Sequence, residues 1–239
     1  MVSLAQIVPY ISLTDQSFLV ARLGSGGALP TSVTLTVTAA AAAAATSIQL
    51  QSSQAGTILK PGTAFSVLSG TRRVPVYINS TTDVTVGTTA AAVTVQPLKF
   101  AIASTSTAPW WIGLIPILGI DSFDFSPDND TAEVTGTDTG SGKAYAKFRA
   151  GQTANITLHE RPGDEGAAIV KYAVDRSEET IANRFIMSVR GDGELISGVA
   201  LFSNGSRPGN KSTNAQLSFN MQFQGSTFSR LDAYNFAVS

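Results

Sequence analysis

The stretch that most constrains the fold of this chain runs from Thr213 to Gly225 and alternates between polar and apolar residues without interruption. The polar set contains only amides and one hydroxyl: Asn214, Gln216, Ser218, Asn220, Gln222 and Gln224. The apolar set is Ala215, Leu217, Phe219, Met221 and Phe223. Strict alternation of this length predicts a β-strand with one face on a core and the other in water. Because the wet face carries no charge, the pattern indicates a solvated surface that does not hold a charged partner.

The composition of the whole chain supports a mainly β fold. Of 239 residues, 43% are hydrophobic and 14% are charged, and Gly, Thr and Ser are abundant. Soluble domains usually carry about 25% charged residues, so we expect much of the surface to be covered by partners. The length allows one large β-domain or two small ones.

Several classes of protein are excluded by simpler features. The formal net charge of −1 gives no general affinity for nucleic acid. The chain has no cysteine, hence no disulfide and no cysteine-based metal site. The N-terminus lacks the basic start and long apolar run of a signal peptide. The longest apolar block, residues 110–120, is too short to span a bilayer and contains Pro116, so we expect a soluble protein made in a cytoplasm, without membrane contact.

The sequence pattern of residues 30–104 differs from that of the rest of the chain. It predicts a small, self-contained β-module inserted into a larger domain, residues 1–29 and 105–239. Expected strands in the module are residues 31–38, 46–50, 64–68, 74–78, 84–86 and 92–95. The run of alanines from Ala39 to Ala45 is too short to hold a helix in water. Its Thr-rich flanks favour a strand extension or a loop, with a helix as the alternative.

The larger domain is expected to contain strands, one long loop and one helix. Strands are predicted within residues 112–125, 185–189, 195–203 and 214–224, with a further hairpin of residues 144–150 and 153–160 about Gly151. The polar stretch 126–142 runs to 17 residues, and loops this long are usually functional or mobile. The helix should begin near Pro162 and end near Asp175 or Ser177, because Pro and acidic residues suit a first turn.

No residue pattern supports an enzyme. His159 is the only histidine, it lies on the polar face of an expected strand, and no nucleophile motif accompanies it. The cluster Asp124, Asp128, Asn129, Asp130 and Glu133 departs from calcium-loop spacing at Ala132 and Val134, so an exposed loop is favoured. We therefore expect no catalytic residue, no metal and no cofactor.

Two further motifs have plain structural interpretations. Arg190-Gly191-Asp192 spells an integrin-binding tripeptide, but between two apolar runs it indicates a hairpin turn. Trp110-Trp111 follows Pro109 and precedes an apolar strand, so a core position is favoured over a sugar-stacking surface.

The order of features in residues 105–239 resembles the tail tube (major tail) proteins of long-tailed bacteriophages. The matching parts are strand 117–125, the polar loop 126–142, A-N-I-T-L-H-E (154–160), P-G-D-E-G-A-A-I-V-K-Y-A-V (162–174), hairpin 185–202 and N-A-Q-L-S-F-N-M-Q-F (214–223). Residues 31–98, with A-T-S-I-Q-L, K-P-G-T-A-F-S-V and V-T-V-Q-P-L, resemble small β-modules of phage structural proteins.

The resemblance implies a β-sandwich or barrel with one flanking α-helix, and a subunit that forms hexameric rings. Rings of this family stack through long loops and terminal arms into a tube through which phage DNA passes. The implied partners are further copies of the chain, the tail terminator, tape-measure and baseplate proteins, and DNA in transient, non-specific contact. The implied location is the virion tail, after synthesis in the bacterial host cytoplasm.

Two sets of site residues follow as hypotheses. Residues expected to line the lumen are Asn214, Gln216, Ser218, Asn220 and Gln222, with Asn155 and Thr157 as weaker candidates. Residues expected at the contact between rings are Asp128, Asp130, Glu133 and Asp138. The apolar partners Leu217, Phe219, Met221 and Phe223 should pack beneath the helix, and the module should lie on the tube exterior.

Two other classes of function remain open at this stage. The first is a different structural protein of the virion: a capsid decoration protein, a baseplate component or a fibre component. These also combine low charge with β-modules, although a fibre would usually show repeats or a terminal adhesion domain. The second is a carbohydrate-binding module, which Trp110-Trp111 and the β-rich composition would suit.

Overall fold

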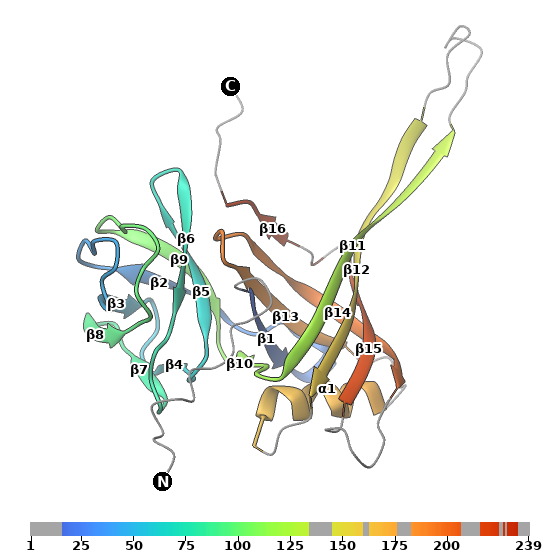
Figure 1. Ribbon diagram of the computed structural model, residues 1–239, viewed down its shortest axis with the longest axis horizontal. Helices are drawn as coiled ribbons and strands as arrows, with labels where there is room; N and C mark the ends of the chain where they lie inside the picture. Colours follow the sequence, from blue (N-terminus) through green and yellow to red (C-terminus); the bar gives the residue numbers. More distant parts are fainter. Residues whose placement is uncertain are drawn as a thin grey trace, which may run out of the picture.

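The computed structural model describes residues 16–133, 145–159, 163–175, 183–206, 216–224, 227 and 229–233. For residues 121, 123–133, 145–152 and 204 it describes the backbone alone. Figure 1 shows two neighbouring β-structures, a single helix below the larger one, and a long two-stranded hairpin that projects from it. The expected class, mainly β with one flanking helix, is confirmed.

The larger structure is an antiparallel eight-stranded sheet with the order β10-β1-β13-β14-β15-β12-β11, and β16 paired with one end of β14. Its strands are β1 (Gln16–Arg22), β10 (Ile115–Pro116), β11 (Ile120–Glu133), β12 (Tyr145–His159), β13 (Asn183–Arg190), β14 (Leu195–Ser206), β15 (Gln216–Phe223) and β16 (Ser229–Leu231). The sheet is curled like half a barrel.

Helix α1 (Glu165–Asp175) covers one face of this sheet. Its Ile169, Val170 and Ala173 belong to one apolar cluster with residues from β1, β12, β14 and β15. Asp164 precedes the helix, and its two carboxylate oxygens accept the N–H of Ala167 at 2.9 Å and the N–H of Leu118 at 3.0 Å. One buried carboxylate therefore caps the helix and holds the chain that precedes β11.

The smaller structure, residues 32–111, is a six-stranded sheet with the order β6-β5-β9-β2-β3-β8. Its strands are β2 (Ser32–Val37), β3 (Ser47–Ser52), β5 (Ala64–Ser69), β6 (Arg72–Tyr77), β8 (Ala91–Thr94) and β9 (Ser106–Trp111), with β4 (Thr57–Leu59) paired to β7 (Val84–Val86) beside them. A bridge between Ile78 and Val95 joins the two outer strands of the order. This closes the sheet into a small barrel, a name used below for residues 32–111.

The barrel and the curled sheet contribute residues to one core cluster, and the division into an inserted module, residues 30–104, stays a prediction. Phe185, Met187 and Leu195 of the sheet lie in the same apolar cluster as the interior of the barrel. The buried hydroxyl of Ser66 donates to the carbonyl of Gly193 at 2.6 Å. The sheet of the barrel also runs on to Trp111, past the expected boundary at residue 104, because β9 pairs along the whole of β2.

Most predictions for single elements are confirmed, and those for the long hairpin are wrong. The strands of the barrel, the helix, the strand 216–223 and the turn at 191–193 are confirmed, and the alanine run forms turns and one bridge at Ala41. The polar stretch from 126 to 133 is strand β11 instead of loop, and residues 145–159 form one strand instead of a hairpin about Gly151. Residues 126–133 carry no apolar alternation that would reveal a strand, whereas Ala146, Phe148 and Ala150 alternate with Lys147 and Arg149.

No helix among the described residues has the length and apolar character needed to cross a membrane.

Candidate functional site

The face of the curled sheet opposite α1 carries a set of uncharged polar side chains, which we call the amide face. It is made of Gln216, Ser218, Asn220 and Gln222 on β15 and of Thr153, Asn155, Thr157 and His159 on β12. Asn155, Asn220 and Gln222 are exposed, and the others are partly exposed. The alternation in the sequence therefore predicted the wet face of β15 correctly.

The register of β12 and β15 brings the two halves of the amide face together in pairs. Directly opposed residues are Thr153 and Gln222, Asn155 and Asn220, Thr157 and Ser218, and His159 and Gln216. The hydroxyls of Thr157 and Ser218 are hydrogen-bonded at 2.9 Å. Opposed residues on adjacent strands point to the same side of the sheet, so these side chains form one surface.

The same surface continues onto the two flanking strands. Ser122 of β11 lies opposite Thr157, and it is exposed. Ser203 of β14 lies opposite Asn220. Sequence analysis missed Thr153, Ser122 and Ser203, because only the strand register shows that they adjoin the alternating stretch.

The opposite side of β15 is fully apolar. Leu217, Phe219, Met221 and Phe223 are buried and share one cluster with the inner residues of α1, as predicted. Phe219 meets the ring of Phe202 edge-on, with 5.3 Å between the ring centroids. β15 thus separates a dry core from a wet surface across the thickness of one strand.

The curl of the sheet turns the amide face away from the barrel. At β1 and β13 the face opposite α1 is apolar, and Leu19, Phe185 and Met187 pack against the barrel. At β12 and β15 the same face is polar and nothing among the described residues covers it. In Figure 1 the barrel lies on one flank of the sheet and β12 and β15 lie on the other.

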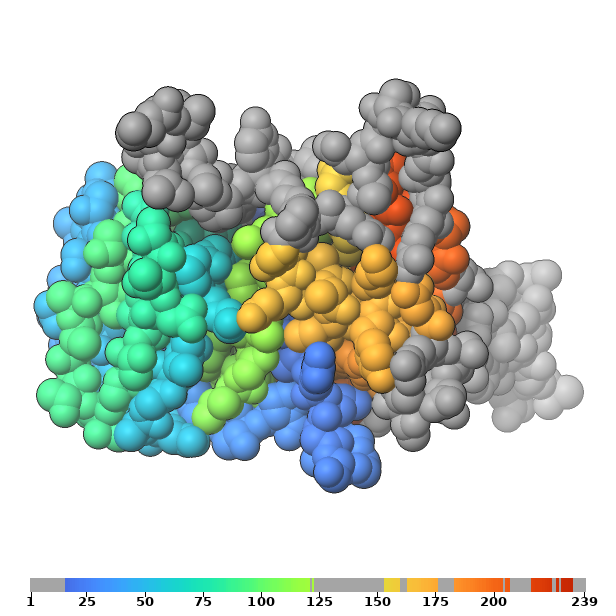
Figure 2. Space-filling view, turned by 90° about the horizontal axis from the view of Figure 1, so that it is seen from below, coloured from blue at the N-terminus to red at the C-terminus, as the bar shows by residue number. Residues whose placement is uncertain are grey.

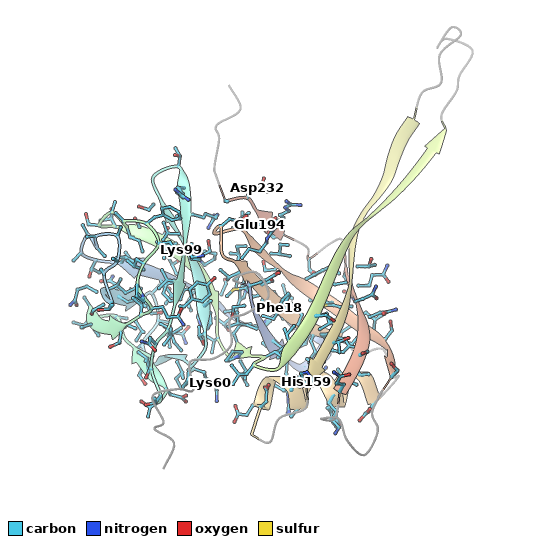
Figure 3. The ribbon with its side chains drawn as sticks, in the orientation of Figure 1. Phe18, Lys60, Lys99, His159, Glu194 and Asp232 are labelled. Atoms are coloured by element: carbon cyan, nitrogen blue, oxygen red, sulfur yellow. The ribbon has the colours of Figure 1, made fainter. Side chains whose placement is uncertain are left out.

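From Thr153 to His159 of β12 and from Gln216 to Gln222 of β15 the amide face carries no Asp, Glu, Lys or Arg, and its one ionisable group is the imidazole of His159. At the edge of this surface, Asp124 of β11 lies opposite Asn155 in the strand register. Charges gather elsewhere, at the β13–β14 turn and at the junction with the barrel (Figure 3). In the turn, Arg190 pairs with the buried Glu194 at 2.7 Å, and Asp192 accepts the N–H of Glu194 at 3.0 Å. The interpretation of Arg190-Gly191-Asp192 as turn chemistry is therefore confirmed.

The remaining candidates are distributed as follows. Asn214 and Asp138 lie outside the described residues. Asp128, Asp130 and Glu133 lie on β11, beyond the part of that strand that belongs to the sheet. From Asp124 to Glu133 an extended strand covers about 30 Å at roughly 3.3 Å per residue, so this acidic segment does not wrap around one point as a calcium loop does.

The two tryptophans are part of the shared core. Trp110 is fully buried inside the barrel, which confirms the core interpretation. Trp111 packs against Phe185 of the curled sheet, with 4.9 Å between the ring centroids. Neither ring therefore forms an open platform for a sugar.

Comparisons with known proteins find structural likeness alone. No protein-family model and no curated protein matches the chain. A chain from the tail of an empty gene transfer agent particle, with C6 symmetry, is similar over 50% of this chain and 87% of its own length, with 14% sequence identity and a TM-score of 0.39. A chain from the virion of a native gene transfer agent particle is similar over 50% of this chain and 89% of its own, with 14% identity and a TM-score of 0.40.

Proposed function

We propose that this chain is a structural subunit of a phage-type tail, and that it assembles with copies of itself into stacked hexameric rings that form a tube. The amide face lines the channel of the tube, and DNA passes along it. The observation that carries the proposal is the amide face itself, a polar surface without charged side chains along β12 and β15 that no described residue covers, on a protein with a well-packed core. The chain acts as a structural protein and has no catalytic role.

The chemistry of the amide face suits the wall of a DNA channel. Each Lys or Arg that reached a phosphate would add a salt-dependent attraction and slow the passage of DNA. Carboxylates would repel phosphates and raise the energy of DNA in the channel. Amides and hydroxyls hold a layer of water with little preference for either charge, and the bond between Thr157 and Ser218 keeps two of these hydroxyls in place.

The shape of the subunit supports the same arrangement. Because the curl of the sheet directs the amide face and the barrel to different sides, a ring that turns β12 and β15 inward has room for the barrel on its exterior. The partners expected of such a subunit are further copies of itself and the tail terminator, tape-measure and baseplate proteins of the same virion.

Electron microscopy of the purified protein in negative stain tests the proposal. We expect stacked rings with a hollow centre. Isolated monomers or trimeric rods would contradict it and would favour a decoration, baseplate or fibre protein. Retention on immobilised polysaccharide by monomers alone would favour a carbohydrate-binding module.

Cysteine labelling tests which surface lines the channel, because the chain has no cysteine of its own. Asn220→Cys in assembled tubes should react with a small maleimide and should be protected from a maleimide on a large polymer. Ile58→Cys is the matched control, since Ile58 is 48% exposed on the barrel, and it should react with both reagents. Tubes in which both positions react with the large reagent would place the amide face on the outer wall.

A further inference from the structure

Two arginines lie opposite each other on adjacent strands at one end of the curled sheet. Arg22, the last residue of β1, is paired in register with Arg184 of β13. Both side chains point to the side that α1 covers, because Val20 and Ile186, two residues away on the same strands, belong to the cluster beneath that helix. Like charges in directly opposed positions are destabilising. Natural sequences depart from such local rules mainly at functional sites, so the pair marks this end of the sheet for closer attention.

The two guanidinium groups lie in different environments. Arg184 is 6% exposed, and its Nη1 donates to the carbonyl of Asn183 at 2.6 Å. Burial lowers the pKa of Arg184, the like charge of Arg22 lowers it further, and Tyr172 acts in the opposite direction. Arg22 is exposed, and no carboxylate forms an ion pair with it among the residues that the structure describes. Arg22 is therefore the guanidinium that a ligand can reach, and Arg184 adds to the positive potential behind it.

Arg22 lines a groove of about 530 Å³ between α1, the end of β1 and the segment 112–115. Figure 2 views the molecule from this end, with α1 near the centre. Apart from Arg22 and Glu165 the lining is apolar or aromatic, and it includes Ile112, Ala168 and Tyr172. Small-molecule sites have this range of volume and this make-up, with apolar walls and a few polar groups that fix the orientation of the ligand.

The one carboxylate in this lining, that of Glu165, is already paired. Its Oε2 accepts a hydrogen bond from Nζ of Lys60 on the barrel at 2.7 Å. Asp175, at the end of α1, is not part of the lining. Because Lys60 balances Glu165, the charges of Arg22 and Arg184 leave the groove with a net positive charge among the described residues. The Glu165 carboxylate still faces the groove and disfavours a second negative charge on a ligand.

Charge and lining together select the class of ligand. A carboxylate can accept two parallel N–H bonds from one guanidinium, and it carries a single negative charge. A phosphate monoester would bring a further charge close to Glu165. An aliphatic chain attached to the carboxylate would cover the apolar lining and remove its surface from water.

We propose that this groove binds an aliphatic monocarboxylate. The carboxylate lies on the guanidinium of Arg22, and the chain lies along Ile112, Ala168 and the ring of Tyr172. The site is on the side of the sheet that α1 covers, whereas the amide face is on the other side. It is formed by a single subunit, so it does not depend on the assembly of a tube.

Isothermal titration calorimetry of the purified full chain with sodium octanoate, below its micellar concentration, tests the proposal. We expect saturable binding with one site per subunit. Octanol lacks the charge and acetate lacks the chain, so each should bind more weakly, octanol by about tenfold for the loss of charged hydrogen bonds. Octyl phosphate should also bind more weakly than octanoate. Equal binding of octanol, tighter binding of octyl phosphate, or no saturable binding of octanoate would each overturn the proposal.

Variants test the location of the site. Arg22→Gln should weaken the binding of octanoate by about tenfold and leave that of octanol unchanged. Lys99→Gln is the matched control, since it removes one positive charge from an exposed position on the barrel (Figure 3), and it should bind octanoate as the parent chain does. An equal loss in both variants would show that net charge governs binding, and would contradict a contact at Arg22.

A steric variant gives a second readout that leaves the charge in place. Ala168→Phe puts a ring into the groove and should abolish the binding of octanoate, although Arg22 is retained. Ala168 is exposed, so the melting temperature of this variant without ligand should stay close to that of the parent chain. Full binding by a folded Ala168→Phe would place the ligand elsewhere and overturn the site.

Discussion

The residues of the amide face combine high polarity with an absence of charge. The pair Asn155 and Asn220 shows the principle, because two exposed amides lie directly opposite each other on adjacent strands. Opposite charges in such a pair would contribute roughly 0.2–1 kcal/mol. The subunit forgoes that gain along β12 and β15, which is consistent with a surface whose role is to avoid binding.

A single positive charge on this face is therefore expected to change function without changing the fold. Asn220→Lys should alter the free energy of unfolding by no more than about 0.5 kcal/mol, because the side chain is exposed. Tubes of this variant should retain short DNA duplexes at low salt and release them at high salt. The affinity for DNA should fall more steeply with salt concentration as more phosphates are contacted. The measurement is DNA retention by sedimented tubes across a salt series.

Ile58→Lys is the control, since it adds the same charge to an exposed position of the barrel. Equal retention of DNA by the two variants would show that net charge, and not the position on the amide face, governs binding.

At the scale of elements, β15 is the strand on which both core and surface depend. Its polar side belongs to the amide face, and its apolar side closes the cluster beneath α1. Both sides follow from one period-two pattern, which is why this element could be predicted from the sequence alone.

Truncation of Phe219 should destabilise the subunit and leave the chemistry of the amide face unchanged. Phe219 is 2% exposed and contacts Phe202, and Phe→Ala in a packed core costs roughly 3–5 kcal/mol. Urea denaturation should show this loss for Phe219→Ala, and tubes should fail to form. Gln222→Ala, on the wet side of the same strand, should change stability by about 0.5 kcal/mol or less. A loss below about 1 kcal/mol for Phe219→Ala would mean that the site repacks or that the core is loosely packed.

The hairpin of β11 and β12 was the element that sequence reasoning misjudged. Residues 126–133 contain Pro127 and several acidic residues, a composition typical of loops. They form a strand because β12 offers a paired backbone from Gln152 to Tyr145. Backbone pairing needs no particular side chains, so the pairing of residues 126–133 has little signature in their sequence.

At the scale of the whole molecule, we expect the barrel and the curled sheet to unfold as one cooperative body. They share a core cluster, the buried hydrogen bond from Ser66 to Gly193, and a salt bridge of 2.7 Å between Lys60 and Glu165. The exposed salt bridge adds little, about 0–1 kcal/mol. The shared core dominates, so calorimetry of the subunit should show one unfolding transition instead of two.

A glycine at the junction provides the test. Gly193 has a φ of +99°, and a Cβ there would collide with the carbonyl of Arg73 on the barrel. Gly193→Ala should lower the midpoint of the single transition, through backbone strain of about 1–2 kcal/mol and a further ~1–3 kcal/mol of overpacking. Gly56→Ala is the control, because Gly56 also has a positive φ, of +72°, but its Cβ would meet open space. Two transitions, of which Gly193→Ala moves only one, would contradict a single body.

The sequence alone determined the local features of this protein. The alternation at 213–225 set the strand and its two faces, the acidic start at Asp164 and Glu165 marked the helix, and the scarcity of charge indicated a β-rich surface for partners. The first two signals lie within a single stretch of chain, and the third is the composition of the chain. None of them depends on which elements adjoin.

The tertiary structure alone decided which elements adjoin. Strand register placed Thr153 beside Gln222 and Ser203 beside Asn220, the curl of the sheet turned the amide face away from the barrel, and Phe185 and Met187 joined two β-structures in one core. These facts depend on backbone pairing and on packing between residues far apart in the chain. A local pattern shows that a residue is buried or exposed, but the partner that buries it is fixed only when the whole chain has folded.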